Sequence, residues 1–340
     1  MEENSMKRKY MIIVLMAGAL ELTGCSQGTS NSAKNGTTGS ENTIISESDI
    51  AILDTEDMFT ERDRDTEYDE SECTAISLSD EETKCDSDGV KMDGQTVTIT
   101  EGGTYLLTGS LSNGSVVVDT DKTEKVQLIL ENVSIINEEG AGICVEQADK
   151  VFITLADGST NKIVSNSFTG NEDTNIDGAI FSREDLTLNG SGTLKITSAA
   201  HGIVSKDDLV LTGGVYQIQS EKQGLSGKES VRIADGTFTI TSGTDAIHSE
   251  DTDEDTKGFV YITGGVLTLA AGGDGISSSY VVQADGGNFD ISTSSTETDT
   301  STKGIKAQKY VILKDGTYQL ATADDGIHCN GNVYVCGGTY

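Results

Sequence analysis

The strongest constraint on the fold is a repeat that fills residues 178–340. Each copy holds a small residue followed by an aliphatic one, then a Leu-Val-Leu-like segment, a Gly-Gly or Asp-Gly pair and a Tyr-Gln-Ile-like segment. The copies are spaced by 22 or 23 residues, or by 29 where an acidic insertion enters. Their aliphatic positions are Ile180, Ile203, Leu225, Ile247, Ile276, Ile305 and Ile327, and Ile143 marks a divergent earlier copy. Because one such unit cannot bury a hydrophobic face alone, we expect the copies to stack into a continuous core.

Each copy has room for three short β-strands separated by turns. The Gly-Gly and Asp-Gly pairs fall where the backbone needs a positive φ, which Gly adopts without strain. Three strands per 22 residues, stacked copy on copy, predict an all-β parallel β-helix with coils about 4.8 Å apart. We expect about seven recognisable coils and almost no helix.

Alternation along the strands assigns the inner and outer positions. In the third strand of each copy the inward pairs stack like on like: Tyr216 and Ile218, Phe238 and Ile240, Phe289 and Ile291, Tyr318 and Leu320. In the second strand the outward column is unusually apolar: Thr187, Val210, Arg232, Tyr261, Val282, Ile312 and Tyr334. Such a column implies a partner, a covering loop or a sugar-binding face. Tyr261 and Tyr334 are the aromatic residues placed to stack on a pyranose ring.

The first 25 residues have the pattern of a targeting segment. Lys7, Arg8 and Lys9 precede a short apolar run, which ends in the lipoprotein-type sequence Leu-Thr-Gly-Cys at Cys25. This pattern predicts a signal peptide over residues 1–25, lipidation of Cys25 and an extracellular protein anchored to the cell membrane. An ordinary cleaved signal is the alternative.

The rest of the chain divides into a linker and the repeat domain. Residues 26–55 are rich in Ser, Thr, Asn and Gly and are expected to form a flexible tether. Residues 56–340 then form the β-helix. The last four residues match the beginning of a strand in the copy at 213–216, so we expect further coils beyond Tyr340.

The charge of the chain limits its partners. A formal net charge of −33 argues against nucleic acid, whose phosphates require Lys and Arg. It suits a soluble surface protein or one that collects cations. Since there is no Trp, affinity for sugars should rest on hydrogen bonds and cation-bridged carboxylates more than on stacking.

Aspartates recur in one slot of the repeat and predict Ca²⁺ ligands. Asp245, Asp274 and Asp325 precede the aliphatic position, so their carboxylates should lie close together on stacked coils. Neighbouring carboxylates repel, and a Ca²⁺ ion bound through their oxygens would reverse that cost. Asp324 lies beside the last of them, and the insertion at 250–258 adds Asp251, Asp253 and Asp255. A solvated acidic loop is the alternative for the insertion.

Several segments together carry a family resemblance. "MFTERDRDTEYDES" (58–71), "TVTITEGGTYLLTGSLSNGSVVVDTDKTEKVQLILENVSI" (96–135), "ADKVFITLADGSTNKI" (148–163) and "AIFSREDLTLNGSGTLKIT" (179–197) follow one another in this order. The series resembles the bacterial carbohydrate-binding domain family of secreted, calcium-binding parallel β-helix proteins. The resemblance implies a right-handed β-helix similar to that of pectate lyases, bound calcium, and affinity for plant polysaccharides such as cellulose and acidic pectic chains. It does not imply catalysis.

Two sets of basic residues fit this resemblance. Arg183, Lys206 and Lys228 form a column on three consecutive coils, which could grip an acidic sugar chain or pair with the adjacent acids. Pectate lyases use an Arg or Lys near calcium as the base, and Lys303 and Lys306 are the candidates on the coil after Asp274. Lys303 occupies the Asp slot itself, which weakens this role.

Three functions remain open from the sequence. The first is a calcium-dependent polysaccharide-binding lipoprotein at the cell surface. The second is a pectate-type polysaccharide lyase on the same scaffold, and the third is a surface adhesin or spacer that binds no carbohydrate.

Overall fold

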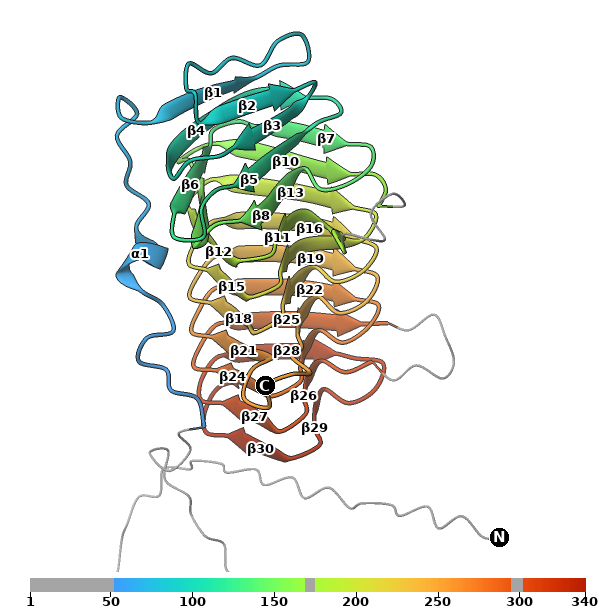
Figure 1. Ribbon diagram of the computed structural model, residues 1–340. Coiled ribbons are helices and arrows are strands. Elements are labelled where there is room, and N and C mark those ends of the chain that lie inside the picture. The colour runs from blue at the N-terminus through green and yellow to red at the C-terminus, as the bar shows by residue number, and fades with distance from the viewer. Residues whose placement is uncertain (1–51, 169–174, 295–301) are drawn as a thin grey trace, which may run out of the picture.

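Each repeat of the sequence forms one turn of a parallel β-helix, as predicted. The repeat around Ile203 supplies β14 (His201–Ser205), β15 (Asp208–Leu211) and β16 (Val215–Ser220), and β17 (Leu225–Gly227) then begins the next turn. This computed structural model describes residues 52–168, 175–294 and 302–340, which make about nine turns (Figure 1). In those residues the only helix is α1 (Glu61–Arg64), so none has the length and hydrophobicity that a membrane-spanning helix needs.

The strands of successive turns pair into three parallel ladders, which we call sheets A, B and C. Sheet B contains β3 (Thr96–Ile99), β5 (Ser115–Asp119), β8 (Ile143–Gln147), β11 (Gly178–Ser182), β14, β17, β20 (Ile247–Ser249), β23 (Ile276–Ser278), β26 (Ile305–Ala307) and β29 (Ile327–Cys329). At its N-terminal end β2 (Val90–Asp93) pairs antiparallel with β3.

Sheets A and C follow on each turn. Sheet A contains β1 (Thr74–Leu78), β4 (Gly103–Leu111), β6 (Lys125–Leu130), β9 (Lys150–Leu155), β12 (Asp185–Gly190), β15, β18 (Ser230–Ile233), β21 (Phe259–Ile262), β24 (Val281–Ala284), β27 (Tyr310–Leu313) and β30 (Asn332–Val335). Sheet C contains the end of β4, then β7 (Ser134–Asn137), β10 (Thr160–Ser165), β13 (Thr193–Ser198), β16, β19 (Thr237–Ser242), β22 (Val266–Ala271), β25 (Asn288–Thr293) and β28 (Thr317–Ala321).

The register confirms the alignment of the repeat. The aliphatic positions pair in unbroken order from Ile143 through Ile180 and Ile203 to Ile327. The helix has about nine turns where the sequence suggested seven. The additional turns lie N-terminal to Ile180, where Val116 pairs with Ile143 across 27 residues and the 22-residue spacing is hidden.

The core is a stack of like side chains, as the alternation predicted. The rings of Tyr216 and Phe238 lie parallel with centroids 4.8 Å apart, and those of Phe289 and Tyr318 lie 4.7 Å apart. Leu267 fills the position between the two ring pairs and is fully buried. The turn before each ring depends on Gly: at Gly214 the φ angle is 98°, a left-handed conformation that disfavours other residues.

A segment from the N-terminal region covers the outward face of sheet A. We call residues 52–65 the strap; it runs along the axis from the C-terminal turns toward β1 (Figure 1). Leu53 and Met58 pack against Tyr261, Val281 and Ile312. The covering segment, one of three explanations left open by the sequence, therefore accounts for the apolar column.

Two details of that column differ from the prediction. Gln283, and not Val282, occupies the outward position beside Tyr261, because Gln283 lies seven residues after Ile276, the same offset as Arg232 after Leu225. Tyr261 is only 4% exposed, and the ring of Phe59 lies 5.9 Å from its ring. Tyr261 therefore offers no open face to a sugar, whereas Tyr334 is half-buried next to Tyr310.

Candidate functional site

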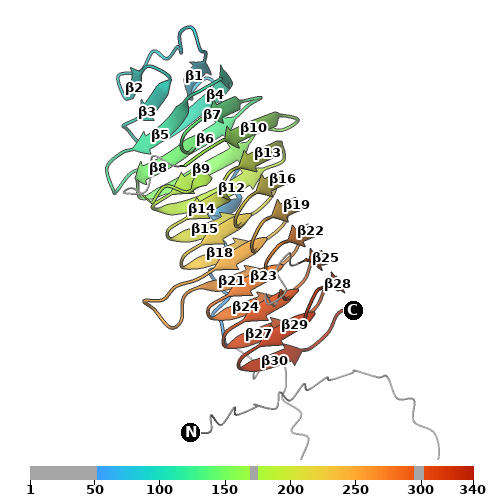
Figure 2. The same ribbon diagram turned by 90° about the vertical axis from the view of Figure 1, so that its right-hand side faces the viewer.

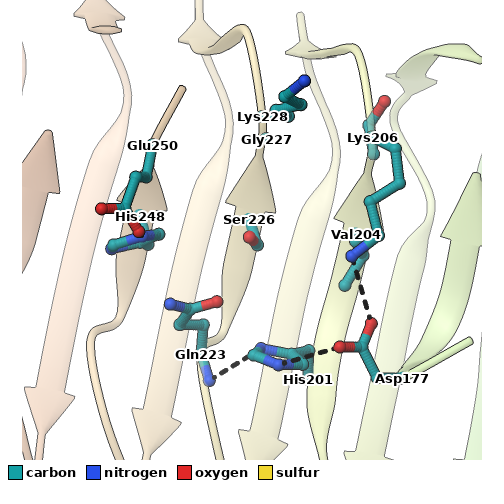
Figure 3. Close-up of a pocket in the computed structure, with 11 residues that line it drawn as sticks. Asp177, His201, Val204, Lys206, Gln223, Ser226, Gly227, Lys228, His248 and Glu250 are labelled. Carbon is teal, nitrogen blue, oxygen red and sulfur yellow. Dashed lines mark hydrogen bonds and ion pairs between the residues drawn. The ribbon is translucent and has the colours of Figure 1, made fainter. Parts of the chain in front are cut away.

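A polar groove lies on the outward face of sheet B. It has a volume of about 300 Å³ and spans β14, β17 and β20 (Figure 3). Register places Val204, Ser226 and His248 side by side on its floor. The residues two positions later, Lys206, Lys228 and Glu250, form one wall; His201 and Gln223 belong to the other.

The lysines of this wall are paired but accessible. Lys206 Nζ lies 3.6 Å from Asp177, and Lys228 Nζ lies 2.8 Å from Asp253. Their side chains are 39% and 40% exposed, so these ion pairs are weak and open to competition. The hydrogen bond to Asp253 raises the pKa of Lys228 and keeps it charged.

Arg183 continues the predicted basic column on the preceding coil. Its Nε lies 2.7 Å from Glu146, and its guanidinium lies over the Phe181 ring. Salt bridges between coils therefore explain much of the column, although the partners are not the adjacent acids that the sequence suggested. Lys206 also lies over Phe181, which fixes the stem of its side chain.

His201 is a groove residue that the sequence analysis missed. Burial, reinforced by Lys222 and Lys206, lowers its pKa to about 4 against the opposing charge of Asp177. Its Nδ1 accepts the backbone N–H of Gln223 at 3.3 Å, so the neutral ring carries its proton on Nε2, which faces Asp177 at 3.5 Å (Figure 3). Its place in the column of Gln223 and Asp245 is the signal that could have found it.

The recurring Asp slot is formed as predicted, but its carboxylates already have partners. Asp245 accepts the N–H of Asp274 at 2.7 Å and binds His248 Nδ1 at 2.8 Å. Asp274 accepts the N–H of Lys303 at 2.7 Å and binds Lys306 Nζ at 2.7 Å. The backbone contacts tie successive coils together, and each carboxylate also has a side-chain partner, which for Asp274 is the Lys306 ammonium group.

The remaining predicted ligands are spread out. Lys303 pairs with Asp324 and lies 3.7 Å from Asp325, which also binds His328 Nδ1 at 3.0 Å.

In the insertion, Asp251 is buried and accepts two backbone N–H groups of its own loop. Asp253 pairs with Lys228, and Asp255 is almost fully exposed. The structure thus does not gather Asp251, Asp253 and Asp255 around one point.

A different set of carboxylates does come together. Within the described ranges, the only three ligand-type side chains with oxygens inside 4.8 Å of one another are Asp207, Asp208 and Glu229. Asp207 and Glu229 lie in the turns between sheets B and A on consecutive coils, and Asp208 is the first residue of β15. Burial, with the charges of Asp185 and Glu229, raises the pKa of Asp207 to about 7. Such crowded oxygens are the donor type that Ca²⁺ prefers.

Two basic residues partly balance this carboxylate cluster. Arg232 binds Asp208, and Lys257 binds Glu229, which leaves Asp207 as the member without a cation partner among the described residues. The donor set therefore fits a hard divalent cation best at Asp207. The sequence analysis did not single out these residues as metal ligands, because it considered the recurring Asp position before the aliphatic residue and not the turn between the first and second strands of each coil.

Comparison with known proteins supports a carbohydrate-related role. The model of a family described as "carbohydrate-binding domain-containing protein" matches residues 93–340. The chain belongs to this carbohydrate-binding family. A curated relative with the same description, from Acetivibrio thermocellus, is 34% identical over 137 residues, which is 39% of this chain and 48% of the relative. The chain thus spans about half the length of that relative.

A solved structure in the comparison shares the fold of this family member. It is titled a polysaccharide lyase-like protein from C. thermocellum, gadolinium derivative. Its sequence is 28% identical, the TM-score is 0.64, and the match covers 79% of this chain and all of that one. These findings confirm the predicted fold and family. They leave calcium and the lipid anchor as predictions, and Cys25 lies outside the described residues.

Proposed function

We propose that this protein is a cell-surface lipoprotein that holds an acidic, plant-type polysaccharide in the sheet B groove with the help of calcium. The observation that carries the proposal is the pair of accessible ammonium groups, Lys206 and Lys228, on successive coils beside a polar floor. Coils about 4.8 Å apart are close to the length of one sugar residue in an extended chain. Carboxylates along such a chain can replace Asp177 and Asp253 as partners of the two lysines.

The other groove residues suit the hydroxyl groups of a sugar. Gln223 and Ser226 offer donors and acceptors, and the His201 ring is neutral, so it adds no charge of its own to the groove. Glu250 and Asp177 oppose a polyanion at the two ends of the groove. A bound cation would reduce that repulsion, which is the role we assign to calcium.

The first test is binding to polygalacturonate. Replacing Lys206 and Lys228 together with alanine is expected to weaken binding at least tenfold, because two charge-assisted contacts are lost. Isothermal titration calorimetry or affinity electrophoresis would measure this. Lys162→Ala with Lys195→Ala, two exposed lysines paired on sheet C, is the matched loss of positive charge. An equal loss of affinity in that control would contradict binding of polygalacturonate in the groove.

The second test is calcium. A cation that binds only the folded protein raises its melting temperature by mass action, and chelation removes the gain. We expect Asp207→Ala to abolish most of the calcium-dependent shift and Asp274→Ala to leave it largely in place, since Asp274 already binds Lys306. Calcium binding would be refuted if neither EDTA nor added calcium changed the melting temperature.

Lyase activity is the second candidate, favoured by the description of the solved neighbour as lyase-like. A lyase needs a base within reach of the proton beside the sugar carboxylate. Lys303 is buried and paired with Asp324, and Lys306 is held by Asp274, so neither is directed at the groove floor.

We therefore expect binding without turnover. Incubation with polygalacturonate and calcium at alkaline pH should give no absorbance from unsaturated uronides. Steady product formation that is lost in Lys306→Ala would establish the enzyme instead.

A further inference from the structure

The outward face of sheet C is a regular, nearly uncharged lattice. From β13 to β28 the strands pair in continuous register with no bulge, and their outward side chains are almost all exposed. Figure 2 shows these strands following one another in an even stack along the axis. The central row consists of Lys195, Gln217, Thr239, Thr268, Asp290 and Gln319.

This composition is unusual for the protein that carries it. The chain has a net charge of −33, yet the three outward rows from β13 to β28 contain only Lys195 and Asp290 as charged residues. The other positions are mainly Thr, Gln, Ser, Val and Ala. Val266 is 45% exposed and is one of few large apolar side chains at the surface of the described residues.

The lattice has the dimensions of an extended, flat contact. Neighbouring strands are about 4.8 Å apart, and outward residues on one strand are about 6.7 Å apart, so the six strands span about 24 Å. The hydroxyl groups of Thr237, Thr239 and Thr241 are exposed and form no hydrogen bond within the described residues. The face therefore offers methyl groups and hydroxyl groups without internal partners on a regular array of strands.

We propose that the outward face of sheet C is a second binding surface, which docks on the ordered face of an uncharged polysaccharide. Sugar rings in such a face present flat C–H surfaces and rows of hydroxyl groups. Thr and Val methyl groups suit the former, and Thr and Gln polar groups suit the latter. Each contact is weak, and a rigid array gains by making many at once without ordering a loop. The inference rests on the proposed function only in taking polysaccharide as the ligand.

The absence of charge selects this occupant over others. A polyanion would find lysines only at one end of this face, where Lys195 pairs with Lys162 of β10, and no cation in the outward rows from β16 to β28. A charged partner would gain few ion pairs on this face, whereas the hydroxyl groups and C–H surfaces of uncharged sugar rings need none. The groove of sheet B and the lattice of sheet C would thus hold glycans of different charge.

The test uses the full chain and two probes: microcrystalline cellulose powder and soluble polygalacturonate. Thr239→Glu combined with Thr268→Glu places two charges in the centre of the lattice, on adjacent coils. We expect at least a tenfold loss of affinity for the powder, measured by depletion, and less than a twofold change for polygalacturonate. Retained polygalacturonate binding also shows that the variant is folded.

Two further variants complete the experiment. Thr252→Glu with Thr256→Glu makes the same chemical change in the exposed insertion and should leave powder binding unaltered. Lys206→Ala with Lys228→Ala should weaken only polygalacturonate binding. If the lattice variant binds the powder as the unmodified protein does, or if the unmodified protein does not bind it, the sheet C inference is wrong. If the unmodified protein binds the powder but does not bind polygalacturonate, the proposal for the groove is wrong and the sheet C inference is not.

Discussion

Replacing Asp63 with alanine is expected to lower the free energy of unfolding by about 3 kcal/mol, because it breaks a buried ion pair between the strap and sheet A. The Asp63 side chain is 2% exposed, and its carboxylate lies 2.8 Å from Lys150 Nζ and 2.6 Å from the Thr187 hydroxyl. Its second oxygen accepts the N–H of Thr60 and so completes the N-cap of α1. One substitution thus removes the cap and leaves the Lys150 charge without its partner.

The same carboxylate predicts a dependence on pH. Burial alone would raise the pKa of Asp63, but hydrogen bonds from Lys150 and Thr187, with the Lys150 charge, outweigh it and hold the pKa below 3.8. A depressed pKa contributes stability above the pKa of the unfolded chain and loses it as pH falls through the folded value. The gap between the unmodified protein and Asp63→Ala should therefore be full at pH 7, begin to narrow near pH 4, and narrow further as pH falls through the lower pKa of the folded state.

Chemical denaturation at several pH values would measure both effects. Asp57→Ala provides the control, since Asp57 is an exposed aspartate of the same strap. A loss at Asp63 no larger than that at Asp57 would show that the strap contributes little to the folded state.

Phe238→Ala should lower the free energy of unfolding by about 3–5 kcal/mol. The Phe238 ring is fully buried, stacks on Tyr216 at 4.8 Å and is paired in register with Leu267 on the next turn. Truncation leaves a cavity in a column where neither neighbour can move inward, because each is fixed by its own strand register. Thr239→Ala, the next residue on β19 and exposed, should change stability by no more than about 0.5 kcal/mol. Equal effects at the two positions would contradict the core assignment.

The sequence predicted the β-helix well because the signal is repeated. An inward residue such as Ile247 is predicted by its own neighbours and again by the equivalent positions on the adjacent coils, Leu225 and Ile276. The one misplaced position of the outward column was an error of alignment and not of the repeat. Gln283 lies seven residues after Ile276, as Ile312 does after Ile305, so the regular spacing itself identifies Gln283 and not Val282 as outward.

The site was harder to predict than the fold. The Asp slot was identified, but the backbone N–H groups that donate to Asp245 and Asp274 are invisible in a sequence. Likewise, Tyr261 reads as a surface aromatic until residues 58–59, about 200 positions earlier in the chain, are found lying over it. Contacts of this range depend on the path of the strap, which no periodic pattern encodes.

The strap also determines how the protein would respond to a pull. It enters the fold beside Ile312 and makes its firmest contacts at Asp63, several turns away along the axis. Tension applied to Ile52 along that axis loads the strap lengthwise, so the packed rings and the buried ion pair resist in shear, all at once. The same tension applied across the axis would peel the contacts one by one. A protein built in this way is mechanically strongest when its load runs parallel to the direction in which its coils stack.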